Sequence, residues 1–285
     1  NRRALPRPGG CFEKTELYEM EVFTMAFVKT EVQGAVEIIT IDRPKALNAL
    51  NPEVLADLKA AFEAVDQDTI RCIVLTGEGD KSFVAGADIG SMSTMTKAEG
   101  EAFGKLGNDV FLMIESFPIP VIAAVNGFAL GGGNELAMSC DIRICSDNAV
   151  FVQPEVGLGI TPGFGGTQRL ARLVGMGMAK QLVYSALNIK ADEAYRIGLV
   201  NAVYPQAELM ENVLKLANKI AKNAPIAVRN CKKAINDGLD ADMDQAVAIE
   251  EKLFGDCFET EDQKYGMAFF LDKNKEKVKE PFQNK

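Results

Sequence analysis

The sequence predicts an α/β fold in which short parallel strands are covered by helices. Short apolar runs alternate with longer stretches in which apolar residues recur every three or four positions, and these are the spacings of strands and amphipathic helices. Several of the short runs are almost entirely apolar, such as 120–125, which is typical of strands buried on both faces of a parallel sheet. The chain has 285 residues, 47% of them hydrophobic, which is enough for one large core.

The first half of the chain contains most of the predicted strands. A strand at 34–41 leads to a helix at 52–65, which opens with Pro52 after Asn51 as its N-cap. Proline is favoured in the first helical turn, and an asparagine cap accepts a free helix amide. The apolar face of this helix consists of Leu55, Leu58, Phe62 and Val65. The remaining expected elements are strands at 71–76, 83–88, 120–125 and 141–145, a helix at 94–116 and a helix that begins within 134–139.

The two ends of the chain differ from its middle. Helical patterns dominate beyond Thr167, as at Leu209, Val213, Leu216 and Ile220, so we expect a core at 25–221 and a helical C-terminal region at 222–285. Residues 1–24 are first basic and rich in Pro and Gly and then acidic, and Met25 opens a strand pattern. We interpret 1–24 as a leader or an added expression segment. A targeting peptide is the alternative, but the glutamates in this segment count against it.

Charge and composition exclude several classes of function. The net charge is −9 and the pI about 4.8, so we expect no nucleic-acid partner, because such a surface would be basic. No apolar run is long enough to span a membrane. The chain has no histidine, which excludes Ser-His-Asp and Cys-His catalysis and His-ligated zinc. Proton transfer must therefore be carried out by Glu, Asp, Lys, Tyr or Cys. We also expect no bound metal.

Cysteine spacing indicates the redox environment. None of the six cysteines forms a C-x-x-C pair, and Cys72 lies within an apolar run. We therefore expect buried, reduced thiols in a cytosolic protein. A structural disulfide or a catalytic cysteine is the alternative.

Two glutamates, Glu135 and Glu155, lie in glycine-rich stretches twenty positions apart. Glycine lets backbone amides approach a ligand closely, and a carboxyl beside such amides suits proton transfer next to a developing oxyanion. Simpler interpretations exist. The glycines at 131–133 could pack a helix against a strand, Glu135 could complement a helix dipole, and Glu155 could be a surface carboxylate.

Five motifs, two of which contain these glutamates, follow one another along the chain. They are Asp42-Arg-Pro-Lys-Ala-Leu-Asn-Ala-Leu50, Phe83-Val-Ala-Gly-Ala-Asp-Ile89, Pro120 through Leu136, Phe151-Val-Gln-Pro-Glu155-Val-Gly-Leu-Gly-Ile160, and Pro162-Gly-Phe-Gly-Gly-Thr-Gln-Arg-Leu170. Together they resemble the crotonase (enoyl-CoA hydratase) superfamily from about Met25 to the C-terminus. The resemblance implies a crotonase-like spiral of ββα units. It also implies that the helical region at 222–285 serves oligomerisation, as a homotrimer or a homohexamer built from two trimers.

The resemblance also implies a substrate and roles for single residues. The substrate would be an acyl-CoA thioester, so that CoA enters with the substrate and no separate cofactor is needed. The amides of Ala87 and Gly132 would form the oxyanion hole. Glu135, ionised, would activate a water, and Glu155, protonated, would deliver a proton to C2. The expected substrate-binding residues are Lys45, Ala85, Asp88, Ile89, Gly131 and Gly163, of which Asp88 would mainly order its turn.

The sequence also suggests which residues surround the acyl group and the CoA moiety of the substrate. We expect residues 91–107 to form its wall, with contributions from Met92, Met95, Phe103 and Leu106. Two positions depart from the family pattern. Gly90 stands where many hydratases have a lysine, and Val278 stands where an aromatic residue often stacks near the adenine. The lysines at 273, 275, 277 and 279 either supply positive charge for CoA or form a solvated tail.

The presence of both glutamates favours hydration among the reactions of the superfamily. We therefore expect reversible syn hydration of a short-chain 2-trans-enoyl-CoA, such as crotonyl-CoA, in the cytoplasm of a bacterium rather than in a mitochondrial matrix. An enoyl-CoA isomerase and a non-catalytic binding protein on the same fold are the alternatives. An isomerase needs no water held by two carboxyls, and a binding protein would be expected to lack one glutamate or the oxyanion glycines.

Overall fold

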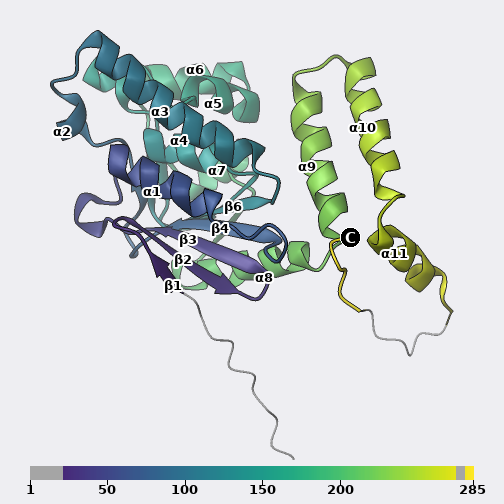
Figure 1. The fold of residues 1–285 in the computed structure, drawn as a ribbon. Coiled ribbons are helices and arrows are strands. Elements are labelled where there is room, and N and C mark those ends of the chain that lie inside the picture. Colours follow the sequence, from purple (N-terminus) through teal and green to yellow (C-terminus); the bar gives the residue numbers. More distant parts are fainter. Residues whose placement is uncertain (1–21, 274–279) are drawn as a thin grey trace, which may run out of the picture.

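The computed structural model describes residues 22–273 and 280–285, which form two sheets surrounded by helices (Figure 1). The larger sheet has the strand order β1-β2-β3-β4-β6-β8-β11, and the smaller has the order β10-β9-β7-β5. The strands of the larger sheet are β1 (Val22–Thr24), β2 (Val28–Gln33), β3 (Val36–Ile41), β4 (Cys72–Gly77), β6 (Val121–Val125), β8 (Ile142–Ser146) and β11 (Ala202–Tyr204). Those of the smaller sheet are β5 (Ser82–Ala85), β7 (Phe128–Leu130), β9 (Val150–Val152) and β10 (Ile189–Lys190).

The central part of the chain repeats one unit three times. In each repeat one strand enters the larger sheet, the next enters the smaller sheet, and a helix follows. The repeats are β4-β5-α3, β6-β7-α4 and β8-β9-α5, and their strands pair in parallel within each sheet. The predicted spiral of ββα units is therefore confirmed. Antiparallel pairing occurs where β1, β2 and β3 meet and where β9 meets β10.

Helices cover both faces of the larger sheet, which explains its continuous apolar strands. Ile39, Ile73 and Leu75 point into a core shared with α1, whereas Val36, Val74 and Ile122 pack against α8 on the opposite face. The helices up to α8 are α1 (Pro52–Glu63), α2 (Ile89–Met92), α3 (Lys97–Ser116), α4 (Gly132–Ser139), α5 (Gly166–Val174), α6 (Met176–Ser185), α7 (Ala191–Arg196) and α8 (Leu209–Ala221). Short 3-10 helices are η1 (Pro44–Ala46), η2 (Glu155–Leu158) and η3 (Gln206–Glu208).

Most predicted elements lie within a few residues of their expected positions. Asn51 caps α1 as predicted, because its side chain accepts a 2.9 Å hydrogen bond from the amide of Val54. The strand expected at 83–88 ends at Ala85 instead, because Asp88 is extended and caps α2. The helix expected at 52–65 ends at Glu63, although Val65 is still buried.

Further secondary structure lies near both ends of the chain, before and after the repeats. Strand β1 lies within the segment expected to be a leader, and it pairs with β2. At the other end, α9 (Pro225–Leu239), α10 (Met243–Cys257) and α11 (Glu261–Leu271) follow α8, so the expected C-terminal helices are present. Figure 1 shows α9 and α10 as a hairpin set beside the body that carries the sheets. The domain boundaries themselves stay a prediction, and Val278 and the lysines at 275, 277 and 279 lie outside the described residues.

A largely buried ion pair connects α9 to the body of the protein. Lys232 Nζ lies 2.8 Å from Asp141 Oδ2 and also donates to the carbonyl of Ile119. Asp141 in turn accepts a hydrogen bond from the amide of Val121, at the start of β6. Burial raises the pKa of Asp141 despite the nearby Lys232 ammonium, which opposes the shift. The carboxylate is thus desolvated and depends on this lysine.

Replacing Lys232 by methionine should therefore lower the free energy of unfolding by about 3 kcal/mol, because an uncompensated charge is left buried. The midpoint and slope of urea denaturation would measure the change. Lys233→Met is the matched control, since Lys233 forms an exposed pair with Asp237 on the same helix. This control should change stability by less than about 0.5 kcal/mol. Equal effects of the two substitutions would contradict the structural role given to Lys232.

The described cysteines only partly match the expectation of buried thiols. Cys72, Cys140 and Cys145 are free and buried, and burial raises the pKa of each to about 12. Cys231 is free but exposed on α9, which corrects the prediction for that residue. In the described part of the chain, no helix has the length and apolar character of a membrane span. Nor do the described residues include a group of three or more acidic or cysteine side chains placed to hold a metal ion.

Candidate active site

A cavity of about 530 Å³ lies between the carboxyl ends of the small sheet and helix α3. Eight of the predicted site residues line it, namely Ala85, Ala87, Ile89, Gly131, Gly132, Glu135, Glu155 and Gly163. Strands β5, β7 and β9 are parallel neighbours, with Ala85 paired to Leu130 and Leu130 paired to Val152. The segments that follow these strands carry Ala87, Gly132 and Glu155. The fold thus brings together groups that are far apart in the sequence.

Two predicted binding residues do not line the cavity. Lys45 is exposed on η1, outside the cavity, and its contact with CoA stays a prediction. Asp88 orders its turn, as expected. Its carboxylate accepts hydrogen bonds from the amides of Gly90 and Ser91 and lies 2.9 Å from Arg43 Nη2. The hydrogen bond from Arg43 is the main cause of the lowered pKa of Asp88.

The cavity wall formed by α2 and α3 matches the prediction with one exception. Met92, Met95 and Phe103 line the cavity. Leu106 does not, which corrects that prediction, although it packs against the main core as Met92 and Met95 do. Phe164 extends the wall, and its ring makes an edge contact with Phe103 at a centroid distance of 5.2 Å.

The amides of Ala87 and Gly132 are available to a ligand. Leu50 bonds to both neighbours of Ala87, because its amide donates to Gly86 O at 2.8 Å and its carbonyl accepts from Asp88 N at 2.7 Å. Successive residues of an extended chain point to opposite sides, so the Ala87 amide faces away from Leu50. Gly132 is the first residue of α4, where amides have no intrahelical acceptor. Within the described residues, neither amide has a hydrogen-bond partner.

Each glycine before Glu135 has a separate structural reason. Gly131 has φ +47°, and a Cβ there would lie 2.6 Å from Glu155 Oε1. A Cβ on Gly133 would lie 1.8 Å from the carbonyl oxygen of Val84, so α4 can approach β5 only with glycine at this position. Both sequence interpretations of these glycines therefore hold, since Gly133 allows close packing of helix on strand and Gly132 presents its amide to the cavity.

Glu135 is buried, with 1% of its surface exposed, and its carboxyl is held by backbone amides. Glu135 Oε1 accepts hydrogen bonds from Phe164 N at 3.0 Å and from Gly166 N at 2.7 Å. Burial raises the pKa of this carboxyl to about 7, and the negative charge of Glu155 acts in the same direction. The two amides and the charge of Arg169 oppose the shift. The group can thus exchange a proton near neutral pH, which suits a general base or acid.

Glu155 is the first residue of η2 and is also buried. Its Oε1 is 3.5 Å from Gln153 Nε2, whereas Oε2 is buried without a hydrogen-bond partner among the described residues. Burial raises the pKa of this carboxyl. An unpaired buried carboxyl oxygen is costly unless the group is protonated or a ligand completes its hydrogen bonds. Both features favour a proton on this carboxyl, or a donor group of a ligand beside it.

Sequence reasoning quoted several supporting residues without giving them a role. Gln153 Oε1 accepts a 2.8 Å hydrogen bond from Asn134 Nδ2, so this buried amide pair lies beside both glutamates. The backbone of Phe164 holds Glu135, and Arg43 holds Asp88. All four residues lie inside the motifs given above, but their partners are distant in sequence. The site as a whole combines two free amides with two carboxyls of raised pKa, which is an arrangement for proton transfer beside a developing oxyanion.

Comparison with known families defines the class of this protein. The family model described as enoyl-CoA hydratase/isomerase matches residues 31–282. The chain therefore belongs to the enoyl-CoA hydratase/isomerase family, and the resemblance seen in the motifs is confirmed.

Individual relatives agree with this class. The chain is 60% identical over 246 residues to the short-chain-enoyl-CoA hydratase of Clostridium acetobutylicum, covering 86% of this chain and 94% of the relative. It is 56% identical over 246 residues to the crotonyl-CoA hydratase of Syntrophomonas wolfei, covering 86% of this chain and 95% of the relative. The crystal structure of an enoyl-CoA hydratase from Bacillus anthracis superposes with a TM-score of 0.85 at 35% identity, covering 94% of this chain and 100% of that structure.

Proposed function

We propose that this protein is an enoyl-CoA hydratase that adds water reversibly to short-chain 2-trans-enoyl-CoA thioesters such as crotonyl-CoA. The observation that carries the proposal is that Glu135 and Glu155 line one cavity together with the free amides of Ala87 and Gly132. The names of two relatives with 60% and 56% identity, a short-chain-enoyl-CoA hydratase and a crotonyl-CoA hydratase, support the same substrate class. The substrate brings its own CoA, and no further cofactor is proposed.

Each site residue has a separate role in the proposed reaction. The amides of Ala87 and Gly132 donate hydrogen bonds to the thioester oxygen, where negative charge builds as C2 gains enolate character. Glu135, ionised, takes a proton from a water whose oxygen bonds to C3. Because both backbone bonds of Glu135 go to Oε1, Oε2 is the oxygen left for this water. Glu155, protonated, delivers its proton to C2 on the same face. The sum is addition of one water, and the two carboxyls exchange protonation states.

The two carboxyls should not both be ionised at rest. Each is desolvated, and Glu155 itself raises the pKa of Glu135. Two such groups titrate as a pair, with one proton shared between them near neutrality. The two amides at Oε1 stabilise the ionised form of Glu135, which is the form that the proposed reaction requires.

A series of 2-trans-enoyl-CoA thioesters from C4 to C16 tests this function. We expect loss of the enoyl absorbance with the highest kcat/KM at the short end of the series. A 3-enoyl-CoA should be assayed in parallel, because an isomerase of the same family would act on it and leave crotonyl-CoA unchanged. Activity on the 3-enoyl thioester alone would overturn hydration, and binding without turnover of either substrate would indicate a non-catalytic protein.

We also propose a trimer, or a dimer of trimers, in a bacterial cytoplasm. Large apolar side chains on α9, α10 and α11 are exposed in the single chain, among them Met243, Phe254, Phe270 and Leu271. An exposed apolar area of this kind favours association. The bacterial origin of the two relatives and the free, buried cysteines are consistent with a reducing cytoplasm.

A further inference from the structure

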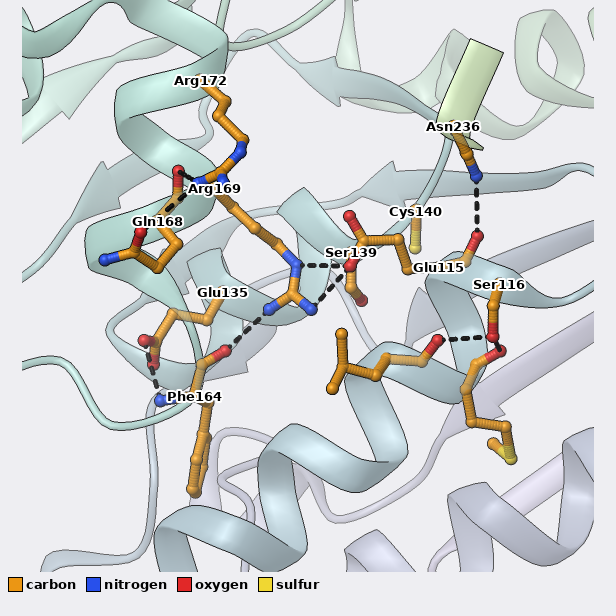
Figure 2. A network of polar contacts seen from close by, with 12 residues as sticks. Glu115, Ser116, Glu135, Ser139, Cys140, Phe164, Gln168, Arg169, Arg172 and Asn236 are labelled. Carbon is orange, nitrogen blue, oxygen red and sulfur yellow. Dashed lines mark hydrogen bonds and ion pairs between the residues drawn. The ribbon is translucent and has the colours of Figure 1, made fainter. Parts of the chain in front are cut away.

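Arg169 lies behind the site, one turn into α5, and its guanidinium forms three hydrogen bonds (Figure 2). Nη1 donates to the carbonyl of Phe164 at 2.9 Å, while Nε and Nη2 donate to Glu115 Oε2 at 3.0 and 2.7 Å. Arg169 is 8% exposed. It faces the protein interior, although it does not line the catalytic cavity.

The loop at 163–166 connects Arg169 to Glu135. Its amides at Phe164 and Gly166 donate to Glu135 Oε1, while its carbonyls point to other partners. The carbonyl of Gly163 accepts from Asn108 Nδ2 at 2.8 Å, and that of Phe164 accepts from Arg169. Gly165 has φ +92°, and a Cβ there would lie 2.2 Å from Arg169 Nη1. The loop is therefore shaped to receive the guanidinium on one side and the Glu135 carboxyl on the other.

We propose that Arg169 is a positioning residue that fixes the loop at 163–166, and through it the Glu135 carboxyl, with Glu115 holding the guanidinium in place. The inference rests on the proposed hydratase function, because Glu135 is the base of that reaction. Arg169 would act through backbone geometry, without touching the substrate. Only arginine has a planar fork that can donate to a carbonyl and a carboxylate at once, whereas lysine offers one point charge.

The charges around Glu135 indicate how the loss of Arg169 would be observed. From η2, Glu155 raises the pKa of Glu135, and from α5, Arg169 lowers it. Glu115 of α3 lies beyond Arg169 and partly offsets its charge. Removing Arg169 takes away one favourable charge and loosens two amides that stabilise the ionised carboxyl. Both changes favour the protonated form of Glu135. A higher pH would therefore be needed to ionise this carboxyl so that it can act as the base.

A matched control lies one turn further along the same helix. Arg172 pairs with Asp240 at 3.6 Å and bonds to Gln168 on its own helix. Like Arg169 it borders the cleft between the body and α9, but among the described residues its hydrogen bonds and ion pair go to Gln168 and Asp240 and not to the loop at 163–166. Arg172→Met therefore removes the same charge and much the same side chain from the same helix, and it leaves the support of Glu135 intact.

The test measures kcat, KM and the pH dependence of kcat/KM for crotonyl-CoA with Arg169→Met, Arg169→Lys, Glu115→Gln and Arg172→Met. Wild type should lose activity as the pH falls through about 7. Arg169→Met should lower kcat about 100-fold, change KM less than about threefold, and shift the acid limb of the profile to higher pH. Arg169→Lys and Glu115→Gln should show the same changes more weakly, and Arg172→Met should match wild type.

Three results would overturn the inference. They are an unchanged kcat and pH profile in folded Arg169→Met, an effect confined to KM, or an equal effect of Arg172→Met. If Arg169→Met does not fold, the same criteria apply to Arg169→Lys and Glu115→Gln, and wild-type behaviour of both would overturn it. A wild-type protein without hydratase activity would instead overturn the proposed function, so the two failures can be told apart.

Discussion

Replacing Glu155 by glutamine should lower kcat for the hydration of crotonyl-CoA by about 10²- to 10⁴-fold, the usual contribution of a general acid. Glutamine has nearly the same shape as glutamic acid, but it cannot deliver a proton to C2. KM should change little, because the oxyanion amides and the cavity wall are untouched. The change is measured as the rate of loss of enoyl absorbance at saturating substrate.

A matched substitution separates this chemistry from a general effect of charge. Glu101 is an exposed residue of α3 that pairs with Lys97, and Glu101→Gln should retain the wild-type kcat. Near-full turnover by Glu155→Gln would show that the role given to this carboxyl is wrong. A loss of kcat together with a large rise in KM would instead indicate that Glu155 mainly holds the substrate.

Replacing Gly133 by alanine should damage both stability and activity. The added Cβ would lie 1.8 Å from the carbonyl oxygen of Val84. Because that atom belongs to the backbone of β5, helix α4 must move away from the sheet to relieve the clash. Overpacking of this kind costs about 1–3 kcal/mol. The same movement displaces the adjacent Gly132 amide, and a shift of about 1 Å in such a group can lower the rate about 100-fold.

Gly177 is a suitable control for this prediction. It also lies in a helix, α6, but a Cβ there would meet no atom within 4 Å. Gly177→Ala should therefore raise the free energy of unfolding by about 0.4–1 kcal/mol, because alanine restricts the unfolded chain. Urea denaturation and kcat should be measured for both variants. A Gly133→Ala protein with wild-type stability and activity would contradict the tight contact between α4 and β5.

The sequence predicts those features of the fold that depend on local pattern. Strand β6 is apolar throughout and β4 nearly so because both are buried on both faces, and Asn51 followed by Pro52 marks the start of α1. The alternation of successive strands between two sheets depends on long-range pairing, and it followed from the family resemblance rather than from periodicity. The position of Leu106 also depends on how α3 is rotated against the core, which a pattern of apolar residues leaves open.

The site was predictable to a similar extent. That Glu135, Glu155, Ala87 and Gly132 would lie in one cavity could be predicted, because glycines and carboxyls cluster around them in the motifs, and their catalytic roles stay a prediction. Their supports were not identified, because the contacts cross long stretches of chain. Arg169 and Glu115 are separated by 54 positions, and Gly133 meets Val84 of another repeat. A local sequence pattern cannot predict contacts between residues that are so far apart in the chain.

The arrangement of strands β5, β7 and β9 has a consequence for how this fold can change its chemistry. Each strand ends beside the cavity, with the amide of Ala87 after β5, the amide of Gly132 after β7 and the carboxyl of Glu155 after β9. In the proposed reaction, thioester polarisation depends on two strand ends, and the fate of the resulting enolate depends on the third. Substitutions after β9 can redirect the enolate toward another product while the first two strand ends keep generating it. In the proposed reaction, separate strand ends thus carry out separate steps. A new activity can arise from changes after β9 while the two oxyanion amides stay unchanged.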